Sequence, residues 1–210
     1  MKKYLSILAI ETGLLLLVLI GTAFGGTKGE GYEVGDKAIG FELKNVDGKM
    51  VSTEDYKKAK GFIVVFTCNT CPYAKLYESR IDELNKQFAD KGYPVLAINS
   101  NDVTKQPGDS FEAMAQQAKE KNYSFPYLYD ESQEIAKAYG ATKTPHVYVL
   151  KKDGKDLTVS YIGAIDNNPQ DANSADTFYV ADAVNQLLAG KEVATKSTKA
   201  IGCTIKWKEA

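Results

Sequence analysis

Two cysteines, Cys68 and Cys71, are separated by two residues, and this spacing suits redox chemistry. Such a pair closes a small disulfide ring, in which one sulfur attacks a substrate disulfide and the other resolves the mixed disulfide that forms. We expect Cys68 to be the attacking thiol and Cys71 to be the resolving thiol. This chemistry requires no metal ion and no organic cofactor, so the sequence predicts neither.

Zinc binding and inert burial are the alternative interpretations of the pair. A structural zinc site takes four ligands, and His146 and Cys203 are the only other histidine and cysteine in the chain. A metal-binding module would therefore have to recruit one or both of them. Two inert core cysteines would need no such partners. A cysteine pair of this spacing beside a strand–helix–strand pattern favours dithiol chemistry over both alternatives.

The residues around the pair predict a strand that leads into a helix. Ile63–Phe66 is a continuous apolar run rich in β-branched side chains, as in a strand buried on both faces. Beyond the pair, apolar residues recur at steps of three and four as far as about Lys91, and Pro72 suits the first helical turn. These apolar residues are Ala74, Tyr77, Ile81, Leu84 and Phe88. Because a helix start favours negative charge, we expect the pKa of Cys68 to be lowered.

Length and composition fit one globular domain. The chain has 210 residues, of which 44% are hydrophobic, enough for a core that needs no cross-links. Its formal net charge is −1, and Arg80 is the only arginine among 26 basic residues, which excludes a typical nucleic-acid surface. If Cys68 and Cys71 pair, Cys203 is left as an odd thiol. Three cysteines are too few for a disulfide-stapled scaffold.

The chain divides into four parts. Residues 1–25 begin with lysines and continue with apolar stretches and small residues, as in a secretory signal or an uncleaved membrane anchor. Residues 26–36 are rich in glycine and charge and predict a flexible leader. We place the folded domain at residues 37–190 and a tail at residues 191–210. The predicted location is periplasmic or otherwise extracytoplasmic, with membrane contact only through an uncleaved N-terminal segment.

The rest of the domain alternates predicted strands and helices. A hairpin with its turn at Asn45–Gly48 precedes the central strand. Tyr93–Ser100 predicts a second buried strand, and the polar loop Asn101–Asp109 follows at the strand end where ligand-contacting loops gather. Later segments predict helices that begin after Ser110, at 131–139 and at 178–188, with strands at 124–129, 144–150 and 157–162. The fold class is therefore α/β.

In element order and motifs, residues 35–189 resemble the thioredoxin-like superfamily, in the redoxin branch of peroxiredoxins and thiol–disulfide reductases. The motifs are FTCNTCPYAK, FPYLYDESQEIAKAYGATKTPHVYV and YIGAIDNNP, with GCTIKW in the tail. The resemblance implies a thioredoxin-like fold with a central mixed sheet, flanking helices and an N-terminal β-hairpin extension. It also implies a thiol–disulfide oxidoreductase that exchanges with protein disulfides and with an electron donor or acceptor protein.

Carried over by position, the resemblance makes Cys68 the nucleophile and Cys71 the resolving thiol. Thr144-Pro145 matches the cis-proline loop that faces the dithiol in thioredoxins. We predict a cis Thr144–Pro145 bond packed against the Cys68 sulfur. We also predict that Thr144 offers an unpaired backbone edge to an extended substrate strand.

The sequence departs from its relatives at two points. Thioredoxins carry a buried acid in the strand before the cysteines, and Gly61–Phe66 has none, so His146 and Asp130 become the candidate proton acceptors. A packed strand histidine is the other interpretation of His146. Peroxiredoxins place Pro-x-x-x-Thr/Ser-x-x-Cys around their reactive cysteine, and neither Cys68 nor Cys71 fits that pattern. Peroxide reduction is therefore the alternative function.

The tail contains an apolar alternation, Ile201–Trp207, that predicts a docked segment. Trp207 would be its main anchor, because an aromatic ring buries about 150–250 Å². Docking near the cysteines would make Cys203 a second resolving thiol or a shuttle to a partner. Docking elsewhere would leave Cys203 a buried, inert side chain.

Overall fold

The structure, a computed structural model, describes residues 31–209. The predicted signal or anchor segment and the first part of the leader lie outside this range. Within it, no helix combines the length and the apolar character needed to cross a membrane. The strands are β1 (Lys37–Ala38), β2 (Glu42–Asn45), β3 (Met50–Ser52), β4 (Gly61–Phe66), β5 (Val95–Asn99), β6 (Tyr127–Tyr129), β7 (Lys143–Thr144), β8 (His146–Asp153), β9 (Asp156–Gly163) and β10 (Cys203–Thr204). The α-helices are α1 (Pro72–Phe88), α2 (Phe111–Lys121), α3 (Glu134–Tyr139) and α4 (Tyr179–Leu188).

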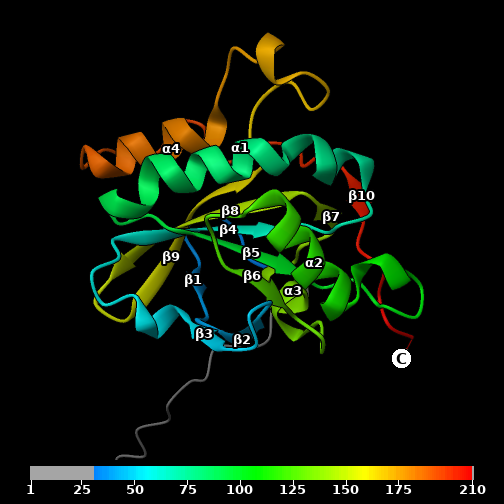
Figure 1. Cartoon of the computed structure of the whole chain (residues 1–210). Coiled ribbons are helices and arrows are strands. Elements are labelled where there is room, and N and C mark those ends of the chain that lie inside the picture. The colour runs from blue at the N-terminus through cyan, green and yellow to red at the C-terminus, as the bar shows by residue number, and fades with distance from the viewer. Residues whose placement is uncertain (1–30, 210) are drawn as a thin grey trace, which may run out of the picture.

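A mixed sheet in the order β1-β9-β8-β4-β5-β6-β2-β3 forms the centre of the molecule (Figure 1). β4 lies inside it, parallel to β5 and antiparallel to β8. All six residues of β4 are buried, as its continuous apolar run predicts. The expected α/β architecture with a central mixed sheet is confirmed.

Helices and loops cover both faces of this sheet, and alternate residues of β4 point into two apolar clusters. Ile63 and Val65 pack with the buried sides of α1 and α4, which lie side by side over one face (Figure 1). Phe62, Val64 and Phe66 pack on the other face with α3 and the N-terminal strands. The helical stripe predicted after Pro72 is buried as expected.

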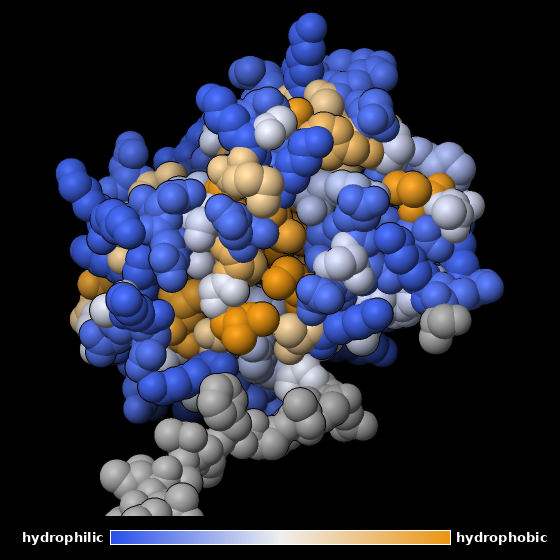
Figure 2. Space-filling view, turned by 90° about the horizontal axis from the view of Figure 1, so that it is seen from below, coloured by the Kyte–Doolittle hydropathy of each residue, from blue (hydrophilic) through white to orange (hydrophobic). Residues whose placement is uncertain are grey.

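The N-terminal hairpin β2–β3 extends the sheet beyond β6. β2 pairs antiparallel with both β3 and β6, and Gly48 takes a φ of 87° in the turn, where a side chain would be strained. Seen from below, hydrophilic side chains surround a strip of apolar ones (Figure 2). Large apolar side chains in the described residues are exposed at Ile39, Met50, Leu76, Phe178 and Ile201.

The tail folds back onto the domain. β10 forms a separate two-stranded sheet with β7, and Ile205 just beyond it is 3% exposed. Trp207 is partly buried against the cluster on the α3 side of the sheet. The predicted docking of Ile201–Trp207 is therefore confirmed, and it carries Cys203 to the start of α1.

Candidate active site

The two cysteines lie where the sequence predicts, between a buried strand and a helix. β4 ends at Phe66, and Cys71 is the N-cap residue of α1, followed by Pro72 at the first helical position. The side chains of Cys68 and Cys71 are each only 3% exposed. Burial therefore does not distinguish the expected attacking thiol, Cys68, from the expected resolving thiol, Cys71.

The disulfide does not join the two neighbouring cysteines. Cys71 is bonded to Cys203, 132 positions further along the chain, and Cys68 is a free, buried thiol. The backbone N–H of Cys203 also donates to Cys71 Sγ at 3.3 Å. The expected Cys68–Cys71 bond with an odd Cys203 is thus wrong for this structure, because the docked tail brings the third sulfur against Cys71.

The Thr144–Pro145 peptide bond is cis, which confirms that prediction. The Cys68 thiol donates to Thr144 Oγ1 at 3.2 Å, and Cys71 Sγ lies 3.2 Å from the carbonyl oxygen of Thr144. One residue of the cis-proline loop therefore contacts both sulfurs.

The backbone edge at Thr144 is occupied. β10 pairs with β7 in antiparallel register, with Cys203 opposite Thr144 and Thr204 opposite Lys143. The expectation of an unpaired edge is wrong for this structure. The edge is covered by β10 of the same chain, because Cys203 and Thr204 adopt extended backbone beside β7.

Burial raises the pKa of the Cys68 thiol, and the nearby charge of Asp109 raises it further. The hydroxyl of Thr144 and the backbone N–H groups of Cys71 and Thr70 act in the opposite direction, since they stabilise a thiolate. The expected lowering of the Cys68 pKa is therefore wrong in this structure, because desolvation outweighs the helix start.

A buried carboxylate that sequence reasoning did not select organises the loop between the cysteines. Asp109 is fully buried, and its Oδ1 accepts from the backbone N–H of Asn69 at 2.7 Å and from Asn99 Nδ2 at 3.3 Å. Its Oδ2 accepts from Thr70 Oγ1 at 2.8 Å and from Asn101 Nδ2 at 2.7 Å. The available signal was the polar loop after the second strand.

The side chain of Asn69 is held equally firmly. Tyr127 donates its hydroxyl to Asn69 Oδ1 at 2.9 Å, and Asn69 Nδ2 donates to the carbonyl oxygen of Gly108 at 2.9 Å. Both residues between the cysteines therefore bond to the loop that follows β5. The backbone that presents Cys68 is fixed from β5, β6 and η3 (Pro107–Asp109).

The two candidate proton acceptors have other partners. His146 pairs with Phe66 in the sheet, and its Nδ1 accepts from the backbone N–H of Thr142 at 3.3 Å. Burial lowers its pKa to about 4, so the imidazole is neutral. Asp130 Oδ2 accepts from Ser100 Oγ at 2.8 Å and from the backbone N–H of Ala136 at 2.9 Å. Asp130 thereby holds the first turn of α3.

The only arginine of the chain is engaged away from the sulfurs. Arg80 Nη1 lies 2.6 Å from Asp166 Oδ2 and donates to the carbonyl oxygen of Asn168 at 2.7 Å. Tyr77 donates to the other Asp166 oxygen at 3.0 Å. This buried pair joins α1 to the segment after β9.

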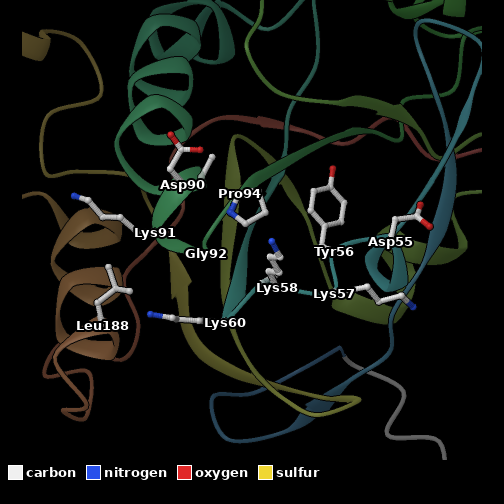
Figure 3. A pocket seen from close by; sticks show the side chains of 12 residues that line it. Asp55, Tyr56, Lys57, Lys58, Lys60, Asp90, Lys91, Gly92, Pro94 and Leu188 are labelled. Atoms are coloured by element: carbon white, nitrogen blue, oxygen red, sulfur yellow. The ribbon is translucent and has the colours of Figure 1, made fainter.

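A hollow of about 920 Å³ lies at the other end of β4 and contains no cysteine (Figure 3). Its lining comes from the segment before β4, the segment just after α1 and the end of α4, and its lysines are exposed. Within residues 31–209, no three His, Cys, Asp or Glu side chains group as a metal site would require. None of the three cysteines lines this hollow, so it is not part of the candidate active site.

The fold and the cysteine site define a thioredoxin-like protein. A solved thioredoxin-like structure, the exposed lipoprotein thioredoxin Etrx1 of Streptococcus pneumoniae, matches with a TM-score of 0.53 and 25% identity over 72% of this chain and 99% of that one. The AhpC/TSA family model matches residues 34–156, and the chain belongs to this family.

Two further relatives have a higher sequence identity to this chain. An uncharacterized conserved protein from Geobacillus kaustophilus is 39% identical, with a TM-score of 0.78 over 85% of this chain and 94% of that one. The thiol-disulfide oxidoreductase ResA of Bacillus thuringiensis subsp. konkukian is 28% identical over 148 residues, which are 68% of this chain and 81% of that protein. The family match ends before the tail that carries Cys203.

Proposed function

We propose that this protein is a thiol–disulfide oxidoreductase that exchanges disulfides with protein partners through Cys68 and Cys71. The observation that carries the proposal is the contact of both sulfurs with Thr144 of the cis-proline loop, at the junction of β4 and α1. Family membership and the similarity to ResA support the same reaction class. Thr144 and Pro145 are the proposed substrate-contacting residues.

In the proposed reaction, the Cys68 thiolate attacks a substrate disulfide. A bond forms between Cys68 and one substrate sulfur, and the other substrate sulfur leaves as a thiolate. The Cys71 thiolate then attacks Cys68 Sγ, which releases the second substrate thiolate and closes a Cys68–Cys71 disulfide. The substrate gains two electrons, and an electron donor protein with a dithiol returns them to the pair. The reverse sequence oxidises a substrate dithiol.

We further propose that the protein acts outside the cytoplasm. The N-terminal sequence pattern supports export, and a structural relative is an exposed lipoprotein. Membrane contact would come only through an uncleaved N-terminal segment.

Equilibration with glutathione buffers tests the exchange reaction. Free thiols are alkylated and counted by mass spectrometry in the wild type and in the Cys68→Ser, Cys71→Ser and Cys203→Ser variants. We expect Cys203→Ser to form a Cys68–Cys71 disulfide over a defined range of buffer potential. If this variant forms no such bond at any potential, the proposed function is wrong.

Peroxide reduction is the second candidate, and membership of the AhpC/TSA family is what favours it. It would require a sulfenic acid at Cys68. The ion pair of Arg80 with Asp166 speaks against it, because that guanidinium is committed elsewhere. Oxidation of Cys68 by stoichiometric peroxide much faster than oxidation of a free thiol at the same pH would support this candidate. A rate equal to that of a free thiol would exclude it.

A further inference from the structure

The tail strand sits on the Thr144 edge as a bound peptide would. Cys203 lies opposite Thr144 in antiparallel register, and the backbone N–H of Ile205 donates to the carbonyl oxygen of Thr142 at 3.2 Å. The Cys203 sulfur meets Cys71 directly. Main-chain pairing of this kind is how an exposed strand edge binds an extended polypeptide.

The edge leaves a different amount of room for the side chain at each position of this strand. A Cβ added to Gly202 would lie 2.1 Å from the carbonyl oxygen of Thr144, so the position before the cysteine has no room for a side chain. Thr204 is exposed, whereas Ile205 is 3% exposed in the apolar cluster of the α3 side. The edge therefore accepts glycine, cysteine, a variable residue and a large aliphatic residue, in that order.

We propose that residues 202–205 are a built-in occupant that excludes substrate from the β7 edge, and that a polypeptide able to replace them carries the same Gly-Cys-x-aliphatic pattern. This inference rests on the proposed function and names the substrate class of that site. The disulfide between Cys71 and Cys203 latches the occupant, so the oxidised protein is closed to substrate.

The tail has further anchors on both sides of the cysteine, and before it the backbone N–H of Thr198 donates to the carbonyl oxygen of Ile162 at 3.0 Å. The backbone N–H of Lys206 donates to Asn101 Oδ1 at 2.8 Å, and Gln133 Nε2 donates to the carbonyl oxygen of Lys206 at 2.8 Å. The backbone N–H of Lys208 donates to Gln133 Oε1 at 2.8 Å. These bonds do not depend on redox state. Among the anchors of the tail, the disulfide alone responds to a reductant.

The latch opens by thiol–disulfide exchange with a dithiol reductant. One reductant thiolate attacks Sγ of Cys203, which is the less buried residue of the bond, and Cys71 leaves as a thiolate. The second reductant thiolate then attacks the reductant sulfur that is bonded to Cys203, and Cys203 leaves as a thiolate. The reductant departs as a disulfide, and two electrons have passed to Cys71 and Cys203. A substrate strand can then replace residues 202–205.

A labelled peptide tests this site without any redox reaction. The probe comprises residues 200–208 with Cys203→Ser, and its binding is measured by fluorescence anisotropy to full-length oxidised wild type, Cys203→Ser and Gly202→Val proteins. An attached strand competes at an effective concentration on the order of millimolar, so weakening it exposes the edge. We expect both variants to bind the probe at least about tenfold more tightly than the latched wild type, since apparent affinity scales with the open fraction.

A matched pair of peptides controls for specificity and avoids any question of folding. A probe that also carries Gly202→Val should lose binding, because its new side chain meets the Thr144 carbonyl, whereas a probe that also carries Thr204→Val should keep it. Equal binding of the Gly202→Val and Thr204→Val probes, or equal affinity of the probe for latched and unlatched proteins, would overturn the proposal. Thiol counting in the same samples reports separately whether Cys68 and Cys71 exchange, so the proposed function is judged independently.

Discussion

The carboxylate of Asp109 holds the loop between the two cysteines and at the same time opposes the ionisation of Cys68. Four donors fill its two oxygens, including the backbone N–H of Asn69 and the hydroxyl of Thr70. Its charge raises the pKa of the Cys68 thiol beyond the effect of burial. Asp109 therefore acts as a positioning residue whose charge also adds to the raised pKa of Cys68.

Replacing Asp109 by Asn should lower the pKa of Cys68. The substitution removes the negative charge and keeps a side chain that can accept from the Asn69 N–H. The pKa is followed by the ultraviolet absorbance of the thiolate as a function of pH. In the oxidised protein Cys68 is the only free thiol of the chain, so a Cys68→Ala protein supplies the baseline.

Asp130→Asn is the matched control, because Asp130 is equally buried but bonds to α3. It should cost stability, about 1–3 kcal/mol for the disturbed hydrogen bonds, and leave the Cys68 pKa unchanged. A Cys68 pKa that moves equally in both variants would contradict a direct effect of the Asp109 charge.

His146 should make stability depend on pH. Its folded pKa of about 4 lies below the ordinary value of 6.5, so the folded state favours the neutral ring. The unfolded chain binds the proton more readily, and the contribution is fully present above pH 6.5 and is lost as pH falls toward 4. The loss is on the order of 3 kcal/mol.

Urea unfolding of the wild type and His146→Asn, at pH 7 and at pH 4, measures this effect. Asn keeps an acceptor for the Thr142 N–H but carries no titratable proton. We expect the stability difference between the two proteins to shrink at the lower pH. A difference that is constant with pH would show that the imidazole titrates alike in both states.

At the scale of elements, the α1 helix is tied to the segment after β9 by the buried pair of Arg80 and Asp166. Their side chains are 8% and 1% exposed. Removing one member of a buried pair leaves the other charge without compensation, which typically costs about 3–5 kcal/mol. We expect Arg80→Met to lose stability of this order in urea unfolding, while the folded protein keeps its thiol exchange.

Lys86→Met provides the comparison on the same helix. Lys86 pairs with Asp82 at the surface, and its side chain is 66% exposed. Such pairs contribute about 0–1 kcal/mol, so this variant should be close to the wild type. If Arg80→Met is as mild as Lys86→Met, the buried pair does not stabilise α1.

At the scale of the whole molecule, the Cys71–Cys203 bond joins the first helix to the tail across 132 positions. A cross-link over a loop of this length restricts the unfolded chain, and its removal typically costs about 2–5 kcal/mol. We expect a reductant to lower the guanidinium midpoint of the wild type. Cys203→Ser cannot form this bond, so its midpoint should not change with reductant when Cys68 and Cys71 are kept reduced. A wild-type midpoint that is equally insensitive would contradict a stabilising role for the bond.

The sequence by itself determined the parts that local patterns encode. The β-branched run before Cys68 and the three-and-four spacing after Cys71 predicted β4 and α1, because side-chain periodicity follows directly from strand and helix geometry. The motif resemblance located the cis peptide bond at Thr144–Pro145. The apolar alternation of the tail predicted that it docks.

Only the tertiary structure decided which cysteines pair and how reactive Cys68 is. No local pattern relates Cys203 to Cys71. The two residues meet only because β10 pairs with β7, and these strands are far apart in the chain. The pKa of Cys68 depends on its burial in the folded molecule and on Asp109, which comes from another loop. Desolvation and through-space charge depend on distances in the folded molecule, and these are set by the packing of the complete chain.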